Sequence, residues 1–77
     1  MADPFGRGAR VMVAFVVIPR PVFEEHRQAL LEIAQKRRTY GAFECHGDEA
    51  TLSFGTEMDA LRFFAYCRGS KIHARYR

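Results

Sequence analysis

An uninterrupted apolar segment restricts the possible folds of this chain more than any other feature. Residues 11–18 read VMVAFVVI, without a polar side chain and with many β-branched residues. A strand with apolar residues on both faces belongs in the centre of a sheet, where both faces are covered. Pro19 and Pro21 follow, and proline cannot donate a ladder hydrogen bond, so the strand must end there. The sequence therefore predicts a central strand over residues 10–18.

An amphipathic helix is predicted over residues 22–39. Side chains suited to a buried stripe recur there at three- and four-residue steps: Phe23, His26, Arg27, Leu30, Ile33, Ala34 and Arg37. Acidic residues occupy the first turn and basic residues the last, which the helix macrodipole favours. Pro21 suits the first helical position, and Gly41 suits a left-handed terminator.

Two short strands are expected next, over residues 42–46 and 50–54. The intervening Gly-Asp-Glu segment has the length and chemistry of a hairpin connection. In the second strand, alternation places Thr51 and Ser53 on the face opposite its apolar residues.

A second helix and a last strand complete the pattern. We expect Thr56 to cap this helix, with Asp59 three residues later, and Gly69 to end it. Its predicted buried stripe is Met58, Leu61, Phe64, Ala65 and Arg68, widened by Ala60, Phe63 and Cys67. Residues 71–76 alternate between apolar and polar side chains, which predicts a strand.

The order of elements is therefore βαββαβ. This order predicts an α+β ferredoxin-like two-layer sandwich, with a four-stranded antiparallel sheet of order 4-1-3-2. Right-handed crossovers place two helices on one face of that sheet. Residues 1–9 contain Pro4, Gly6 and Gly8 without periodicity, so we expect a flexible arm followed by a single domain over residues 10–77.

Composition excludes several classes of protein. With 77 residues the chain forms one small domain, and 48% hydrophobic residues exclude a disordered one. The longest apolar run has eight residues, too few to cross a bilayer, and the first ten lack the apolar core of a signal peptide. Two cysteines make no disulfide framework. We expect a soluble cytoplasmic protein without a membrane or a disulfide-linked partner.

Catalytic and metal-binding patterns are missing from the sequence. Cys45 and His46 are neighbours on one strand, so their side chains point to opposite faces. Cys45 and Cys67 both suit small core positions. His46 and His73 belong to opposite edges of the expected sheet, too far apart to share an ion. There is no glycine-rich phosphate loop. We therefore expect no enzymatic activity, no cofactor and no metal.

The distribution of charge favours a polyanionic partner. Ten of the twelve cations are arginine, and no acidic residue follows Asp59. Arginine suits bidentate phosphate contacts. We therefore predict that the second helix and the last strand contact nucleic acid or a nucleoprotein through Arg62, Arg68, Lys71, His73, Arg75, Tyr76 and Arg77.

The sheet face opposite the helices is predicted to be open and to carry an apolar stripe. The first strand contributes either the odd-numbered set with Val13, Phe15 and Val17 or the even-numbered residues 12–18. An exposed stripe of this kind marks an interface, and we expect the odd-numbered set to form a homodimer. Alternatively, the same face binds single-stranded nucleic acid, or the sheet face or edge docks a partner protein in a regulatory role.

The element order and length resemble those of the RNA-recognition motif. That family stacks bases on aromatic residues of its two central strands, and Phe15 matches the first-strand aromatic. On the third strand, aligning the last aromatic of the motif with Phe54 places Glu49 and Thr51 at the stacking positions. The resemblance therefore extends to the fold and stops short of that family's binding mode.

Overall fold

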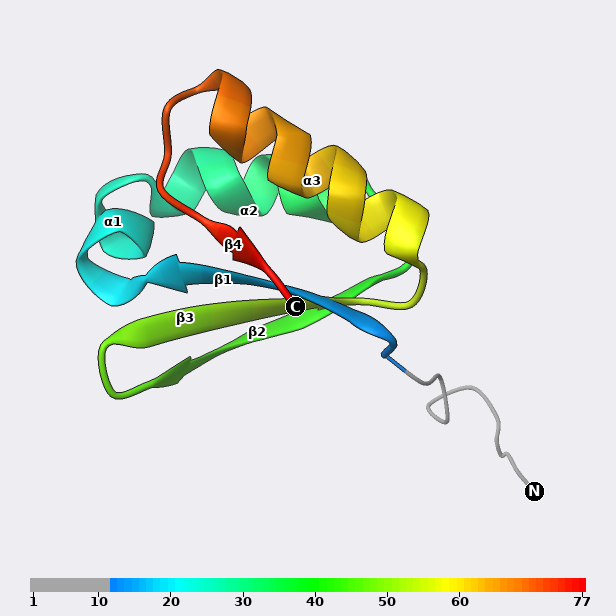
Figure 1. Ribbon diagram of the computed structural model, residues 1–77, viewed down its shortest axis with the longest axis horizontal. Coiled ribbons are helices and arrows are strands. Elements are labelled where there is room, and N and C mark those ends of the chain that lie inside the picture. The colour runs from blue at the N-terminus through cyan, green and yellow to red at the C-terminus, as the bar shows by residue number, and fades with distance from the viewer. Residues whose placement is uncertain (1–11) are drawn as a thin grey trace.

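A computed structural model describes residues 12–77 as one layer of strands and one of helices (Figure 1). The expected arm over residues 1–9 lies outside the described residues. In chain order the elements are β1 (Ala14–Pro19), α1 (Arg20–Glu25), α2 (Arg27–Gln35), β2 (Tyr40–His46), β3 (Glu49–Phe54), α3 (Glu57–Gly69) and β4 (Arg75–Tyr76).

The sheet confirms the predicted topology. Its order is β2-β3-β1-β4, and every neighbouring pair is antiparallel, so β1 and β3 are the central strands. The helices α2 and α3 lie side by side on one side of the sheet (Figure 1). The fold is thus an α+β two-layer sandwich consistent with ferredoxin-like topology. We call the sheet face turned away from the helices the open face.

The core lies between the helices and the sheet. Ala14, Val16 and Ile18 of β1 are fully buried, which settles which face of this strand meets the helices. Residues of β3, of the helices and of the segment between α3 and β4 complete the cluster: Phe23, Leu30, Ala34, Ala50, Leu52, Phe54, Ala60, Phe63, Cys67 and Ile72. Tilted contacts between aromatic rings join Phe63 to Phe54, with ring centroids 5.5 Å apart.

The predicted helix over residues 22–39 is two helices, and it ends earlier than expected. His26 separates α1 from α2 with backbone angles of φ −110° and ψ 17°. After Gln35 the chain turns: the Lys36 and Arg37 N–H groups donate to carbonyls three residues back, at 3.2 and 2.9 Å, and the Thr39 N–H donates to the Asp59 carboxylate at 3.0 Å. Tyr40 then pairs with Phe54 in the sheet, and Gly41 lies within β2 rather than terminating a helix.

The buried stripe of α3 differs from the predicted one. Thr56 caps the helix as expected, accepting a hydrogen bond from the Asp59 N–H at 3.2 Å. However, Ala60, Phe63 and Cys67 alone are fully buried, whereas Met58 and Leu61 are 61% and 46% exposed. The helix carries apolar residues around most of its circumference, so periodicity alone gave the wrong centre for the stripe.

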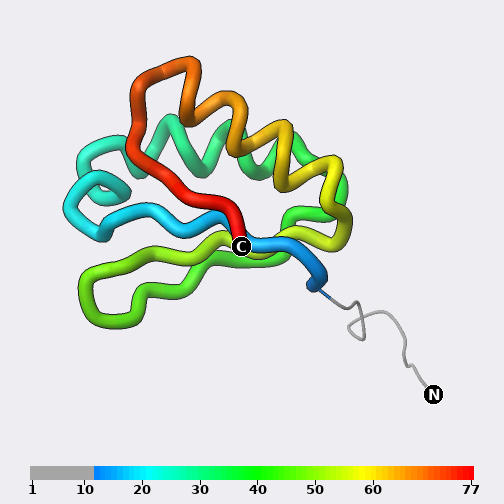
Figure 2. Tube along the Cα trace, in the orientation of Figure 1, coloured from blue at the N-terminus to red at the C-terminus, as the bar shows by residue number. Residues whose placement is uncertain are grey.

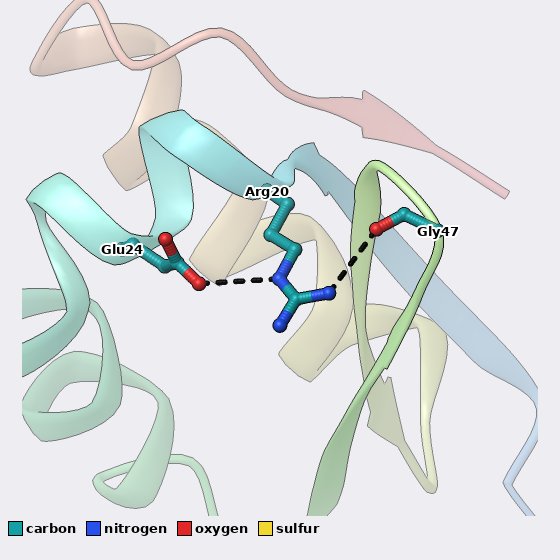
Figure 3. Close-up of polar contacts among 3 residues, drawn as sticks. All are labelled: Arg20, Glu24 and Gly47. Carbon is teal, nitrogen blue, oxygen red and sulfur yellow. Dashed lines mark hydrogen bonds and ion pairs between the residues drawn. The ribbon is translucent and has the colours of Figure 1, made fainter.

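The β2–β3 hairpin is fastened to the start of α1 (Figure 3). Gly47, at φ 59°, begins the two-residue turn, and the Arg20 N–H donates to the Asp48 carbonyl at 2.6 Å. The Arg20 guanidinium donates to the Gly47 carbonyl at 3.3 Å and to the Glu24 carboxylate at 3.1 Å. The turn and α1 therefore lie at the same end of the molecule (Figure 2).

The last strand is shorter than predicted because α3 ends in a Schellman motif. The Ile72 N–H donates to the Cys67 carbonyl at 2.7 Å, and the Lys71 N–H donates to the Arg68 carbonyl at 3.1 Å. Lys71 occupies the left-handed position of this motif, at φ 60°, and Gly69 is the last helical residue. Residues 71–74 consequently lie outside the sheet, and β4 begins only at Arg75.

Replacing Lys71 by glycine is expected to stabilise the protein. A lysine at φ 60° pays the steric cost of the left-handed region, which glycine avoids. We expect Lys71→Gly to raise the free energy of unfolding by about 0.5–1 kcal/mol, measured by urea denaturation. Lys36→Gly serves as the control, because Lys36 has right-handed backbone angles and gains nothing from glycine. A lower urea concentration at the midpoint of unfolding for Lys71→Gly than for the unmodified protein would contradict the expectation.

Candidate nucleic-acid interface

The cations at the end of the chain are already engaged on the open face. Arg75 pairs with Val17 across the β4–β1 ladder, and its Nη1 lies 2.9 Å from the Glu49 carboxylate on β3. This ion pair therefore spans the central strand β1. The Arg77 guanidinium lies over the Phe15 ring, 5.8 Å from its centroid. Both arginines thus have a partner within the fold.

The same contacts reduce the apolar stripe expected on this face. Val13 is 53% exposed, but Phe15 is half-buried and lies under Arg77. Val17 is only 2% exposed, so the expectation that it forms exposed apolar surface is wrong. Its burial follows from its place on a central strand, between the residues that form the Arg75–Glu49 ion pair.

A second group of the predicted residues lies beside the end of α3. Arg68, Lys71 and His73 line a hollow of about 350 Å³, together with Phe64, Ile72 and Ala74. Arg68 lies over the Phe64 ring, 5.8 Å from its centroid. Tyr76 lies on the helix side of the sheet, with its ring 6.2 Å from that of Phe64. Lys71 and His73 are exposed in this hollow. They precede β4, whereas the sequence predicted that both would belong to the last strand.

Arg62 belongs to a third group that the sequence did not reveal. With Lys36, Arg37 and Arg38 it lines another hollow of about 350 Å³, between the end of α2 and the first turns of α3. In the sequence, the three residues after α2 suit the last turn of the predicted helix, where the macrodipole favours cations, and Arg37 also belongs to its predicted buried stripe. Their run of adjacent positive charges was the available signal, but nothing in the sequence indicated that α3 would bring Arg62 to them.

One carboxylate, that of Asp59, also lines this hollow, and it is held in place. It accepts hydrogen bonds from the Thr39 hydroxyl and, at 3.0 Å, from the Thr39 N–H. The hydroxyl bond is the largest cause of a lowered Asp59 pKa, and the N–H bond and the nearby Arg37 charge act in the same direction against desolvation. Asp59 therefore orders the loop that carries the basic run.

This lowered pKa predicts an acid-sensitive contribution to stability. The folded protein keeps Asp59 ionised at pH values where the unfolded chain, with a carboxyl pKa of about 3.9, already takes up a proton. The stabilisation is complete at neutral pH and is lost as the pH falls below about 4. Compared with the unmodified protein, Asp59→Asn should have a lower free energy of unfolding at pH 7. Its free energy of unfolding should also fall less steeply between about pH 5 and 3. Parallel pH profiles for the two proteins, from urea denaturation, would contradict this assignment.

The two cysteines have different surroundings. Cys67 is buried as predicted, and burial raises the pKa of its thiol to about 11. The prediction of a core position for Cys45 is wrong, because this residue is exposed. Cys45 pairs with Ala50 and so faces the helix side, but it lies on the edge strand β2, where a neighbouring strand is present on one side only.

Two features are absent from residues 12–77. No helix in this range is long and apolar enough to cross a membrane. The same range contains no group of three or more His, Cys, Asp or Glu side chains placed to hold a metal ion.

The fold and these surfaces define a small α+β sandwich with cations grouped on its helix layer. Comparison with known proteins finds no matching family model, no matching curated protein and no matching solved structure. The assignment of function therefore depends on the chemistry of this chain alone.

Proposed function

We propose that this protein is a small, non-enzymatic module that binds nucleic acid through its helix layer. The surface consists of six residues, which we call the helix-side cations: Lys36, Arg37, Arg38, Arg62, Arg68 and Lys71. The sequence predicted α3 and the last strand as the contact surface. The proposal keeps α3 and adds the end of α2 in place of the strand.

The observation that carries the proposal is the difference between cations that are paired with a carboxylate and cations that are not. Arg75 is neutralised by Glu49, and Arg20 by Glu24. Within residues 12–77, by contrast, none of the helix-side cations forms an ion pair with a carboxylate. A cation that already has a carboxylate partner loses that contact when it binds phosphate, whereas an unpaired one releases only solvent and counterions.

The arrangement of these cations suits a chain of phosphates. The two hollows lie on either side of α3, with Arg62 lining one and Arg68 the other. Between them, the outer face of α3 presents the exposed side chains of Met58, Leu61 and Ala65. A backbone that crosses α3 would meet positive charge on both sides and apolar surface in the middle, where bases or sugars make contact without requiring a defined sequence.

The test is a fluorescence-anisotropy titration of labelled single-stranded and duplex DNA and RNA at several salt concentrations. If all six cations contact phosphates, the logarithm of the association constant falls with the logarithm of salt concentration at a slope of about −4 for single strands and about −5 for duplexes. Between about 50 and 200 mM salt, affinity then drops by a factor of several hundred or more. Absence of binding at the lower salt concentration, or a slope near zero, would refute the proposal.

The homodimer and the protein-docking alternative remain predictions without a structural observation in their favour. The open face has less exposed apolar surface than expected, because Val17 is buried and Phe15 is partly covered. A stable protein interface typically buries about 800 Å² on each partner. Sedimentation equilibrium of the free protein, with Val13→Lys as the interface variant, would detect a dimer formed through this face.

A further inference from the structure

The hollow between α2 and α3 concentrates more positive charge than an internal phosphate of a nucleic acid requires. Its lining consists of Lys36, Arg37, Arg38, Met58, Asp59 and Arg62. A phosphodiester carries a single negative charge, and one arginine provides it with a bidentate partner. Four cations around one hollow exceed that need, even after the charge of Asp59 is subtracted.

Asp59 does not neutralise the hollow as a free carboxylate would. Its Oδ2 accepts both hydrogen bonds from Thr39, so it is held at the loop that joins α2 to β2. None of the four cations lies within ion-pair distance of it or of another carboxylate of residues 12–77. Within residues 12–77, the lining therefore keeps an excess of cations without a carboxylate partner.

Arg37 supplies an independent indication that an anion belongs here. Its Nε is buried and has no hydrogen-bond partner, and it is the only such side-chain nitrogen or oxygen within residues 12–77. A buried donor without a partner costs about 1–3 kcal/mol, and such groups are rare in folded proteins. An anion in the hollow that Arg37 lines would remove this cost once the guanidinium turns so that Nε and one Nη face two of the anion's oxygens.

We infer that this hollow binds the terminal phosphate of a nucleic-acid strand. A terminal phosphomonoester carries close to two negative charges at pH 7 and exposes three oxygens, so it matches the charge and the donors of the hollow better than an internal phosphodiester. Arg37 engages two of those oxygens, while Lys36, Arg38 and Arg62 balance the remaining charge. The strand then continues over α3 towards Arg68 and Lys71. This inference rests on the proposed function and specifies which part of the nucleic acid occupies the site.

The experiment compares oligonucleotides that differ only at their ends. Three short single strands of one sequence, each labelled internally, carry a 5′-phosphate, a 3′-phosphate or only hydroxyl ends. At about 100 mM salt we expect a terminal phosphate to tighten binding about tenfold. Arg37→Lys keeps the positive charge but removes the two parallel N–H donors of the guanidinium. In this variant the preference for a terminal phosphate disappears, while most of the salt dependence remains. The matched control, Arg75→Lys, retains the preference.

A second measurement tests the hollow without an oligonucleotide. Adenosine 5′-monophosphate and adenosine are titrated into ¹⁵N-labelled protein, and the Nε–Hε signals of the arginines are followed. We expect the Arg37 signal to shift with the monophosphate and not with the nucleoside.

The outcomes separate the inference from the function on which it rests. Equal affinity for phosphorylated and hydroxyl ends overturns the inference, while salt-dependent binding of all three strands leaves the proposed function standing. If no strand binds, the proposed function fails, and an unchanged Arg37 signal in the monophosphate titration overturns the terminal-phosphate site as well. If Arg37→Lys keeps the full preference, the terminal phosphate is recognised elsewhere and the assignment to this hollow is wrong.

Discussion

Phe63→Ala is expected to remove most of the protein's free energy of unfolding at 25 °C. Phe63 is fully buried on α3, and its ring packs against Phe54 of the central strand β3. Truncating a buried phenylalanine to alanine typically costs about 3–5 kcal/mol. A domain of this size has a total stability of about 5 kcal/mol, so the substitution removes most of it. Circular dichroism and urea denaturation would show a largely lost or non-cooperative transition.

The matched control is Leu61→Ala, two residues earlier on the same helix. The Leu61 side chain is 46% exposed and belongs to the outer face of α3, so its truncation should change stability by no more than about 0.5 kcal/mol. The two substitutions distinguish the orientation of α3 in the structure, with Phe63 buried, from the orientation that the sequence periodicity predicts, with Leu61 at the centre of the buried stripe. A larger loss for Leu61→Ala than for Phe63→Ala would mean that α3 is rotated relative to the structure.

The topology could be predicted because a few local signals agree with one another. The apolar segment of residues 11–18 has to be a central strand, and Pro19 and Pro21 place its end within one residue. The glycine at position 47 provides the positive φ of the hairpin turn, and Thr56 provides the cap of α3. Each of these signals depends on residues that are close in sequence, so each can be recognised without the tertiary structure.

The deviations have tertiary causes. The basic segment after α2 is outside the helix, and the Thr39 N–H at its end donates to Asp59, twenty residues later in the chain. Lys71 adopts a left-handed conformation because the Schellman motif places Ile72 against the core, and lysine, unlike glycine or asparagine, gives no sequence signal for that conformation. The partners of Arg75 and Arg77 are similarly distant, since Glu49 and Phe15 meet them only across the sheet. The distribution of charged residues along the sequence therefore located the cationic segment, but it did not show which of these cations already have a partner within the fold.

This distinction leads to the second large effect, a comparison of two double variants with equal loss of charge. Arg38→Gln with Arg62→Gln removes two helix-side cations, and Arg75→Gln with Arg77→Gln removes the two arginines of the open face. Each phosphate contact contributes about an eightfold gain in affinity at about 100 mM salt, so the first variant should bind duplex DNA about sixtyfold more weakly and lower the salt slope by about 2. The second should weaken binding by less than about threefold, through the reduced long-range attraction of the whole protein alone.

Because the net charge changes equally, any difference between the two variants reports position. A similar small loss in both would mean that binding follows net charge and has no defined surface. A larger loss in the open-face variant would place the nucleic acid over Phe15, with Arg77 released from the ring to contact phosphate. In that case Glu49→Gln, which frees Arg75 and removes a negative charge from the same face, should strengthen binding. If binding occurs at the helix layer, Glu49→Gln should leave the affinity within about twofold of the unmodified protein.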